Sequence, residues 1–233
     1  MKLLFSEHSG VNYDRYEFPY CVYCVKEDTD SYHDIYSQGF LPYTNELNTK
    51  EEIFYLARSV RIDLEDGRWN YKQNTVFNKF SKIYDNDCLT IEIYPKEKYI
   101  NDDFFLNWSL NNAKNHFLSQ ERLIYILHRP YLKNIIKISY NNDILAFLFV
   151  VCEEKKYLHT WFSFYDLNVN ENNFGKWILL KTIEWTKKQG YPFFYVGTCY
   201  EKKAFYKLTL NPFTKYFDGS KWNDNISELK KHL

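Results

Sequence analysis

Long hydrophobic runs are absent from this chain of 233 residues. The longest, residues 144–152, is bounded by charged residues, whereas a membrane-spanning helix needs about 20 apolar residues. The apolar start of the chain turns polar at Ser6, which is too early for a signal peptide. We therefore expect a soluble, cytoplasmic protein that makes no contact with a membrane.

Cysteine is scarce, and the five cysteines lack the spacing of a disulfide framework, which favours a reducing compartment. Only Cys21 and Cys24 lie close together in the sequence. Residues three apart in a strand point to opposite faces, and a closed metal site uses four ligands. No second cysteine pair or nearby histidine completes such a site. We expect packed thiols here and no bound metal.

Net charge of either sign is also lacking, because 30 basic side chains balance 30 acidic ones. The balance hides an asymmetry: residues 1–100 carry a net charge of −5 and residues 101–233 a net charge of +5. A basic half can hold a polyanion through phosphate contacts. A solvated lysine-rich surface explains the same asymmetry.

The overall composition is typical of a globular protein, with 45% hydrophobic and 26% charged residues. Aromatic residues are abundant, at 20%. In the first part of the chain, apolar patterns predict strands over residues 20–25 and 53–64. Helical spacing is seen over residues 30–38 and 75–84. The first of these helices has Asp30 or Ser31 as its N-cap, and Gly39 ends it.

The second part shows two helical segments within residues 102–127, broken around Ser119. Three strands joined by short turns follow, which predicts an antiparallel meander over residues 135–140, 144–152 and 157–165. A helix over residues 175–189 and a strand over residues 193–196 then complete a crossover unit. On a helical wheel, Lys176, Lys181, Lys187 and Lys188 fall on the polar half, together with the misplaced Trp177 and Leu180.

A meander that leads into a crossover is the core of the GNAT-type acyltransferase fold. We predict an α+β protein whose mixed, mostly antiparallel sheet is flanked by helices. Residues 88–233 are expected to form the GNAT-like domain. Residues 1–87 are expected to form an N-terminal α+β portion packed on it.

Several motifs of the C-terminal third are specific in their order. They are Ser163-Phe164-Tyr165-Asp166, Gly175, Gly190 to Gly197, Tyr206-Lys207, Asn211-Pro212 and Asp218-Gly219 followed by Trp222. In this order they resemble the aminoacyl-tRNA–protein transferases of the arginyl/leucyl type. The resemblance implies that residues 88–233 form the aminoacyltransferase domain and that residues 1–87 recognise the acceptor. In the N-terminal part, residues 39–42 and 58–61 extend the resemblance. Two features of the family differ in this chain. Residues 70–80 occupy the place of the family's arginine-rich stretch and are not arginine-rich. The longer arginyl enzymes have an N-terminal cysteine cluster, to which only Cys21 and Cys24 could correspond here.

The resemblance implies transfer of an amino acid from aminoacyl-tRNA to the α-amine of an acceptor protein or peptide, as in N-degron pathways. The tRNA is then the donor substrate, and the reaction needs no further cofactor. Which amino acid is transferred, and the oligomeric state, stay open. Asp166, Tyr206 and Lys207 are the candidate catalytic residues. Asp166 could take the proton of the amine or bind its ammonium, and Tyr206 and Lys207 could stabilise the oxyanion or a terminal phosphate.

Further candidates would bind the substrates. Arg58 and Arg61 point to opposite faces of a strand, so at most one can face a pocket and pair with an acidic N-terminal residue of the acceptor. Lys202 and Lys203 would line the approach of the acceptor stem, with Tyr206 near the terminal adenosine. The remaining substrate-binding candidates, taken from the motifs, are Tyr165, Gly197 and Trp222.

Two other functions fit the same fold. The first is an acyl-CoA-dependent N-acetyltransferase, which would cradle the CoA pyrophosphate at the start of a helix. Here Asn172 replaces the usual basic or amide anchor, and the bulky Trp177 replaces a small residue. The second is a binding module on a decayed acyltransferase fold.

Overall fold

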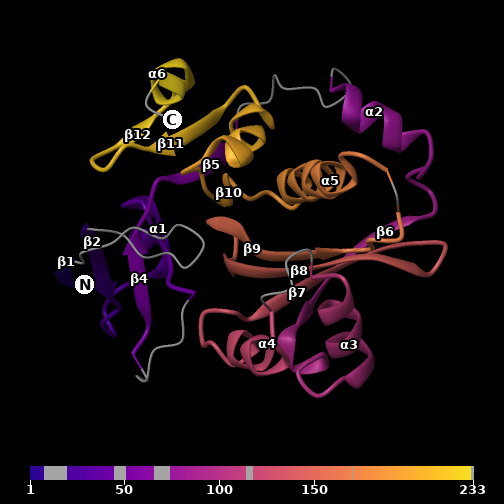
Figure 1. The fold of residues 1–233 in the computed structure, drawn as a ribbon, viewed down its shortest axis with the longest axis horizontal. Helices are drawn as coiled ribbons and strands as arrows, with labels where there is room; N and C mark the ends of the chain where they lie inside the picture. The colour runs from indigo at the N-terminus through magenta and orange to yellow at the C-terminus, as the bar shows by residue number, and fades with distance from the viewer. Residues whose placement is uncertain (8–19, 45–50, 66–73, 114–117, 170, 232–233) are drawn as a thin grey trace. The chain divides into compact units, whose positions relative to one another are not determined.

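The computed structural model describes residues 1–7, 20–44, 51–65, 74–113, 118–169 and 171–231 (Figure 1). By compactness the chain divides into two units. Unit 1 contains Met1–Asp63 and Tyr195–Leu233, and unit 2 contains Leu64–Phe194. This division differs from the sequence boundary between residues 87 and 88, because the end of the chain groups with the N-terminal segment. Of the stretch 70–80, residues 70–73 lie outside the described residues.

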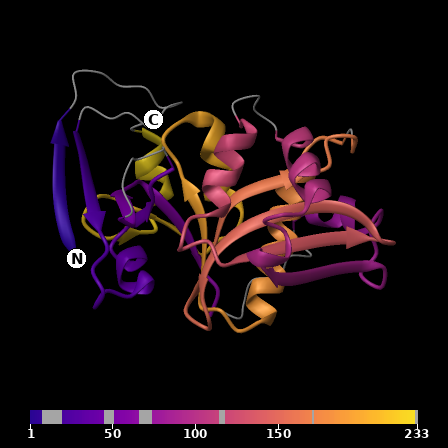
Figure 2. The ribbon, with the colours of Figure 1, turned by 90° about the horizontal axis from the view of Figure 1, so that it is seen from below.

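Unit 2 is built on the predicted antiparallel meander. Strands β6 (Leu89–Pro95), β7 (Asn134–Tyr140), β8 (Asp143–Glu153) and β9 (Tyr157–Tyr165) pair in sequence order. Strand β10 (Phe193–Thr198) lies next to β9, and its residues are shared between the two units. Figure 2 shows the strands of this sheet, with β6 at one edge. The meander predicted from the sequence is confirmed.

Helices cover both faces of this sheet (Figure 1). On one face lie α3 (Asp103–Asn111) and α4 (Gln120–Leu127), whose first turns are capped by the side chains of Asp102 and Ser119. The break predicted around Ser119 is therefore confirmed. The core beneath them is apolar and rich in aromatic rings, with Phe105 and Phe147 only 4.8 Å apart. A short 3-10 turn, η2 (Lys96–Lys98), leads into this layer.

On the other face lies the crossover helix α5 (Phe174–Lys188), with α2 (Thr75–Ser81) packed against it. Trp177 and Leu180, which fall on the polar half of the wheel, are both fully buried. The Trp177 ring stacks on Phe80 at 5.5 Å and on Tyr84 at 5.0 Å. The sheet and α2 cover α5 on two sides. The helix therefore needs apolar residues on both of these sides, and a single apolar stripe does not describe it.

Lys181 was also misplaced by the wheel. Its side chain is 2% exposed, and its Nζ donates to Asn86 Oδ1 at 2.7 Å and to Glu184 Oε2 at 3.2 Å. These residues line a cavity of about 240 Å³ beside β6. Because its hydrogen bonds are made within the fold, Lys181 is not a free surface charge.

Unit 1 contains a four-stranded sheet in the order β1-β2-β4-β3, with all its pairings antiparallel. The strands are β1 (Lys2–Glu7), β2 (Tyr20–Val25), β3 (Phe40–Pro42) and β4 (Ile53–Leu56). Helix α1 (Tyr32–Ser37) is capped by Ser31, and Gly39 follows it with a φ of +84°. The predicted helix and its end are confirmed.

The single strand predicted over residues 53–64 is in fact two strands in different sheets. Strand β5 (Ser59–Asp63) pairs with β11 (Thr214–Phe217), which pairs with β12 (Trp222–Asn223). Between β4 and β5, the N–H of Ala57 donates to Gly39 O, and the N–H of Arg58 donates to the Tyr200 hydroxyl. These two hydrogen bonds end the pairing of β4 with its neighbours in the four-stranded sheet.

The remaining elements of unit 1 are the 3-10 helix η3 (Lys202–Thr209) and helix α6 (Ile226–Lys231). In the part of the chain that the structure describes, no helix combines the length and apolar character that crossing a membrane requires. The predicted α+β class, with a mostly antiparallel sheet flanked by helices, is confirmed.

Candidate functional site

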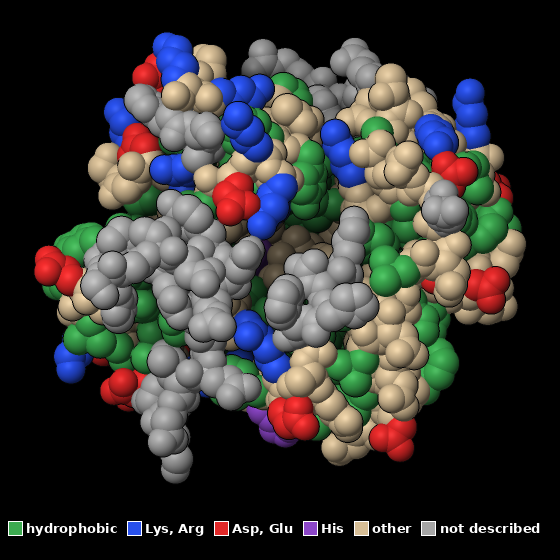
Figure 3. Space-filling view, viewed as in Figure 1, with side chains coloured by type: hydrophobic (Ala, Val, Ile, Leu, Met, Phe, Trp, Pro, Cys, Tyr) green, Lys and Arg blue, Asp and Glu red, His purple; other side chains and the backbone are tan. Residues whose placement is uncertain are grey.

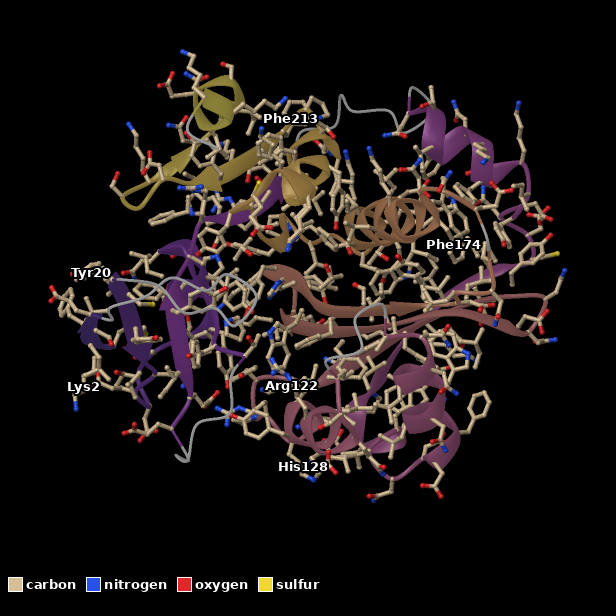
Figure 4. All side chains as sticks on the ribbon, viewed as in Figure 1. Lys2, Tyr20, Arg122, His128, Phe174 and Phe213 are labelled. Atoms are coloured by element: carbon tan, nitrogen blue, oxygen red, sulfur yellow. The ribbon has the colours of Figure 1, made fainter. Side chains whose placement is uncertain are left out.

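A cavity of about 250 Å³ lies within unit 1, where β2, the β4–β5 connection and the C-terminal segment meet. Tyr20, at the start of β2, is one of its walls (Figure 4). Aromatic, aliphatic and charged side chains line it together: Tyr20, Cys21, Val22, Leu56, Ala57, Arg58, Tyr200, Phe217 and Asp218, with Gly219. Such a mixed lining suits a small ligand that is both apolar and charged.

Among the described residues that line this cavity, Arg58 is the one cation. Its guanidinium carbon lies 5.8 Å from the centre of the Tyr200 ring, and the side chain is half-buried. None of the ion pairs found among the described residues includes Arg58. A half-buried guanidinium without a carboxylate partner can bind a ligand carboxylate or phosphate in a bidentate manner.

Asp218 is the acidic side chain of the same cavity, and it is occupied by the fold. Its Oδ1 accepts hydrogen bonds from the backbone N–H groups of Ser220 and Lys221, each at 2.9 Å. These bonds lower the pKa of Asp218 to about 2. The carboxylate therefore stays charged and shapes the turn between β11 and β12.

Lys207, a half-buried residue of η3, directs its ammonium toward the end of β10 in unit 1. Its Nζ donates to Thr198 O at 2.9 Å, and this carbonyl is its only hydrogen-bond acceptor within the described part of the chain. An ammonium has three N–H donors, so two of them have no acceptor among the described residues and can bind a ligand. Burial lowers the pKa of Lys207 to about 8, because desolvation penalises the charged form.

Gly197 and Cys199 are the other neighbours of this ammonium. Gly197 has a φ of +84°, and a Cβ built there would come within 3.4 Å of Lys207 Nζ. Cys199 is fully buried, and its N–H donates to Arg58 O at 3.1 Å. Burial raises the pKa of its thiol, although the charges of Lys207 and Arg58 act in the opposite direction. The Cys199 N–H links the strand end at Gly197 to the Arg58 backbone.

Arg61 and Trp222 also lie in unit 1, but in an internal cluster. The Arg61 guanidinium carbon lies 4.4 Å from the Trp222 ring, and Nε donates to Asp63 Oδ1 at 2.9 Å. Trp222 Nε1 donates to Ser37 O at 2.7 Å. Burial raises the pKa of Tyr195 to about 12, although the nearby charge of Arg61 acts in the opposite direction. Of the two arginines, Arg58 lines the cavity and Arg61 does not.

Two candidates, Tyr165 and Asp166, belong to unit 2. Asp166 Oδ1 accepts from both the backbone N–H and the side-chain amide of Asn168, each at 2.9 Å. This arrangement caps the turn after β9, which is the structural role that aspartate often takes in turns. Asp166 thus stabilises the entry to the crossover.

Tyr165 packs over the start of α5. A Cβ added to Gly175 would come within 2.5 Å of the Tyr165 ring, so only glycine allows this close approach. Phe174, at the same turn, lies 6.0 Å from the Tyr165 ring (Figure 4). Trp177, the residue expected to obstruct this helix start, is buried against Phe80 and Tyr84. The side chain that covers the start of α5 is therefore Tyr165.

The other candidate site residues of η3 are exposed to solvent. Tyr206 is 42% exposed, Lys202 is exposed, and Lys203 is exposed with its Nζ 2.9 Å from Glu201 Oε2. Sequence reasoning missed Tyr200 and Asp218 as cavity residues. Their place directly after the Gly197 strand end, and in the Asp218-Gly219 motif, was the available signal.

Cys21 and Cys24 are both buried in β2, and Cys21 lines the cavity. Burial raises the pKa of both thiols. Within the described ranges, no group of three or more His, Cys, Asp or Glu side chains is arranged to hold a metal ion.

The meander, helix α5 and strand β10 give a mixed α+β fold with a mostly antiparallel sheet flanked by helices. Comparison with known proteins then gives the family. Residues 73–216 match the family described as "Arginine-tRNA-protein transferase, C terminus". Because this match covers more than half of the chain, the protein belongs to that family, and the resemblance read from the sequence is confirmed. Among curated proteins, no sequence matches.

Several solved structures are similar to this chain at low identity. The C-terminal DUF2156 domain of an Agrobacterium fabrum protein has 13% identity and a TM-score of 0.45 over 66% of this chain and 50% of that one. L-PGS from Bacillus licheniformis has 14% identity and a TM-score of 0.43 over 71% of this chain and 50% of that one. An aminoglycoside acetyltransferase from an uncultured soil metagenome has 20% identity and a TM-score of 0.30 over 53% and 84%. The chain spans about half the length of the first two.

Proposed function

We propose that this protein transfers an amino acid from aminoacyl-tRNA to the α-amine of an acceptor protein or peptide. The observation that carries the proposal is the family match, whose range includes both Gly197 and Lys207. The enclosed ammonium at this position offers the donor that ester aminolysis requires. The reaction as proposed uses no metal and no CoA.

The chemistry is a substitution at an activated ester. The neutral α-amine attacks the carbonyl carbon, a C–N bond forms, and the carbonyl oxygen becomes an oxyanion. The bond to the 3′-terminal ribose oxygen then breaks, and the proton lost by the amine ends on that oxygen. Lys207 would donate its remaining N–H groups to the oxyanion. This stabilisation of the oxyanion is strongest where water is excluded.

Arg58 would bind the acceptor. Its guanidinium faces a cavity of the size of an amino-acid side chain, and no ion pair with a carboxylate is found for it among the described residues. A carboxylate on the first residue of the acceptor, as in an N-terminal Asp or Glu, would satisfy it. Arg61 is already engaged by Asp63 and Trp222, so Arg58 is the better candidate.

The acyl-CoA-dependent alternative is disfavoured by the start of α5. A pyrophosphate cradle needs open backbone N–H groups in the first turn of the helix. Here the Tyr165 ring packs directly on Gly175, which leaves less room for a phosphate. This observation replaces the argument from Trp177 and leads to the same preference.

The test is a transfer assay with the full chain. A mixture of radiolabelled aminoacyl-tRNAs is offered with peptides that begin with Asp, Glu or Ala. We expect label on the acidic peptides and at least a tenfold loss in kcat for Lys207→Met. Labelling from acetyl-CoA with none from any tRNA would establish the acetyltransferase instead. No transfer from either donor, with retained binding of a peptide, would establish a binding module.

A further inference from the structure

We propose that the outer face of η3, formed by Lys202, Lys203 and Tyr206, is the docking surface for the single-stranded 3′ end of the donor tRNA. This inference rests on the proposed function and names where its donor binds. It follows from how one short helix divides its side chains between the interior and the solvent.

The division is a consequence of 3-10 geometry. Successive residues are rotated by about 120°, so neighbours in η3 face different directions. Lys207 sends its ammonium inward to Thr198 O, and Leu208 is 4% exposed. The preceding Tyr206 is 42% exposed. Adjacent residues thus present an exposed ring and an enclosed ammonium.

An exposed ring beside two lysines matches the chemistry of a single-stranded nucleic acid. Bases stack on aromatic side chains, and lysines follow the phosphates. Lys203 is paired with Glu201, but exposed ion pairs contribute little, so a phosphate can compete for this ammonium. In Figure 3, Lys and Arg side chains lie over η3 and also over α6 in the upper left of the view, so the lysines of α6 have to be tested separately.

The placement also connects binding to chemistry. A terminal base stacked on Tyr206 would hold its ribose ester close to η3. Lys207 is the next residue of this helix. The segment from residue 176 to residue 233 carries a net charge of +6, which favours the approach of a polyanion. Lys181 makes no part of this surface, because it is buried in unit 2.

Helix α6 of the same unit supplies a matched control. Lys230 and Lys231 are also exposed lysines adjacent in sequence, and Lys231 pairs with Glu228 at 3.2 Å, much as Lys203 pairs with Glu201. They belong to a separate helix that bears none of the residues of the motif. Reversal of their charge therefore changes the net charge equally without touching η3.

The experiment compares three variants in transfer kinetics and in binding of uncharged tRNA at several salt concentrations. Lys202→Glu/Lys203→Glu should raise KM for aminoacyl-tRNA about tenfold and lower the slope of log K against log salt by about 1 to 2. The control Lys230→Glu/Lys231→Glu should change both by less than about twofold. Tyr206→Ala should raise KM, also for the minimal donor 3′-O-aminoacyl-adenosine, which the lysine variant should use normally.

Equal effects of the two lysine variants, or no effect of the η3 variants on tRNA binding, would overturn the docking surface. These outcomes differ from failure of the proposed function. If the wild type transfers nothing from any tRNA, the function fails, and the binding arm with uncharged tRNA still decides the surface. Circular dichroism of each variant confirms that η3 substitutions leave the fold intact.

Discussion

Lys207 shows how far a single residue depends on its surroundings. In the sequence it is one lysine among many, and the Tyr206-Lys207 motif marks it only by resemblance. In the structure its Nζ is enclosed beside Gly197, with one carbonyl acceptor and a pKa of about 8. A lysine in ordinary solvent would stay charged to far higher pH. Tertiary burial therefore turns a common side chain into a group that titrates near neutrality.

The first prediction concerns the pH dependence of transfer. The attacking α-amine must be neutral, which favours activity as pH rises through about 7.7 to 8.0. The Lys207 ammonium must be charged to donate, so activity should fall again above its pKa of about 8. We expect a bell-shaped profile of kcat for the wild type. Lys207→Arg, whose guanidinium stays protonated, should keep the rising limb and lose the falling one.

The measurement is kcat at saturating tRNA from pH 6 to 10, with aminoacyl-tRNA hydrolysis subtracted at each pH. A falling limb that persists in Lys207→Arg would assign it to another group. Lys207→Met serves as the matched variant without a donor, and its rate should be low at every pH.

The second prediction separates the two arginines. Arg58→Met should raise KM for a peptide with an N-terminal Glu about tenfold or more, because the ligand carboxylate loses a bidentate partner. KM for the tRNA should change little. Arg61→Met should instead lower stability, since Arg61 holds Asp63 and stacks on Trp222.

Steady-state kinetics with Glu-initiated and Gln-initiated peptides, together with thermal unfolding, distinguishes these roles. If Arg61→Met shows the larger change in the preference for Glu over Gln, the assignment of Arg58 to the acceptor is incorrect.

At the scale of elements, α5 explains which parts of the pattern could be read from sequence. The helix itself, its limits and the strands around it were predicted well, because apolar spacing and terminal residues act locally. The wheel places Trp177 and Lys181 on its polar half, yet both are buried. Their burial depends on α2, which packs on the side of α5 that a single-stripe wheel assigns to solvent.

The third prediction tests the contact at the start of α5. Gly175→Ala should destabilise unit 2, because the new Cβ would lie within 2.5 Å of the Tyr165 ring. In a Tyr165→Ala background the same substitution should be neutral or stabilising by up to about 1 kcal/mol, the helix preference of alanine over glycine. The double-mutant cycle is measured by denaturant unfolding. Additive effects of the two substitutions would show that the ring and Gly175 do not interact.

At the scale of the whole molecule, the fourth prediction links the enclosed ammonium to stability. Because its pKa is lower in the folded state, the unfolded chain binds more protons between about pH 8 and 10.5. Lys207 therefore disfavours folding below pH 8, and this penalty disappears as pH rises towards 10.5. A lowering from 10.5 to about 8 corresponds to about 3 kcal/mol.

Lys207→Met removes this titration. Relative to the wild type, the variant should be more stable at pH 7, and the difference should shrink steadily up to about pH 10.5. Urea unfolding at several pH values measures it. A difference that stays constant with pH would mean that the Lys207 ammonium is solvated in the folded protein.

The sequence by itself determined the elements, the meander and crossover, and the family, since these depend on short-range spacing and on motifs that keep their order. It also marked Lys207, Gly197 and Arg58 as candidates. Only the tertiary structure decided that residues 53–64 divide between two sheets, and that the C-terminal segment groups with the N-terminal one. It also decided that Arg58 lines a cavity while Arg61 is engaged internally. These features depend on which distant backbone and side-chain groups satisfy one another, and no local pattern carries that information.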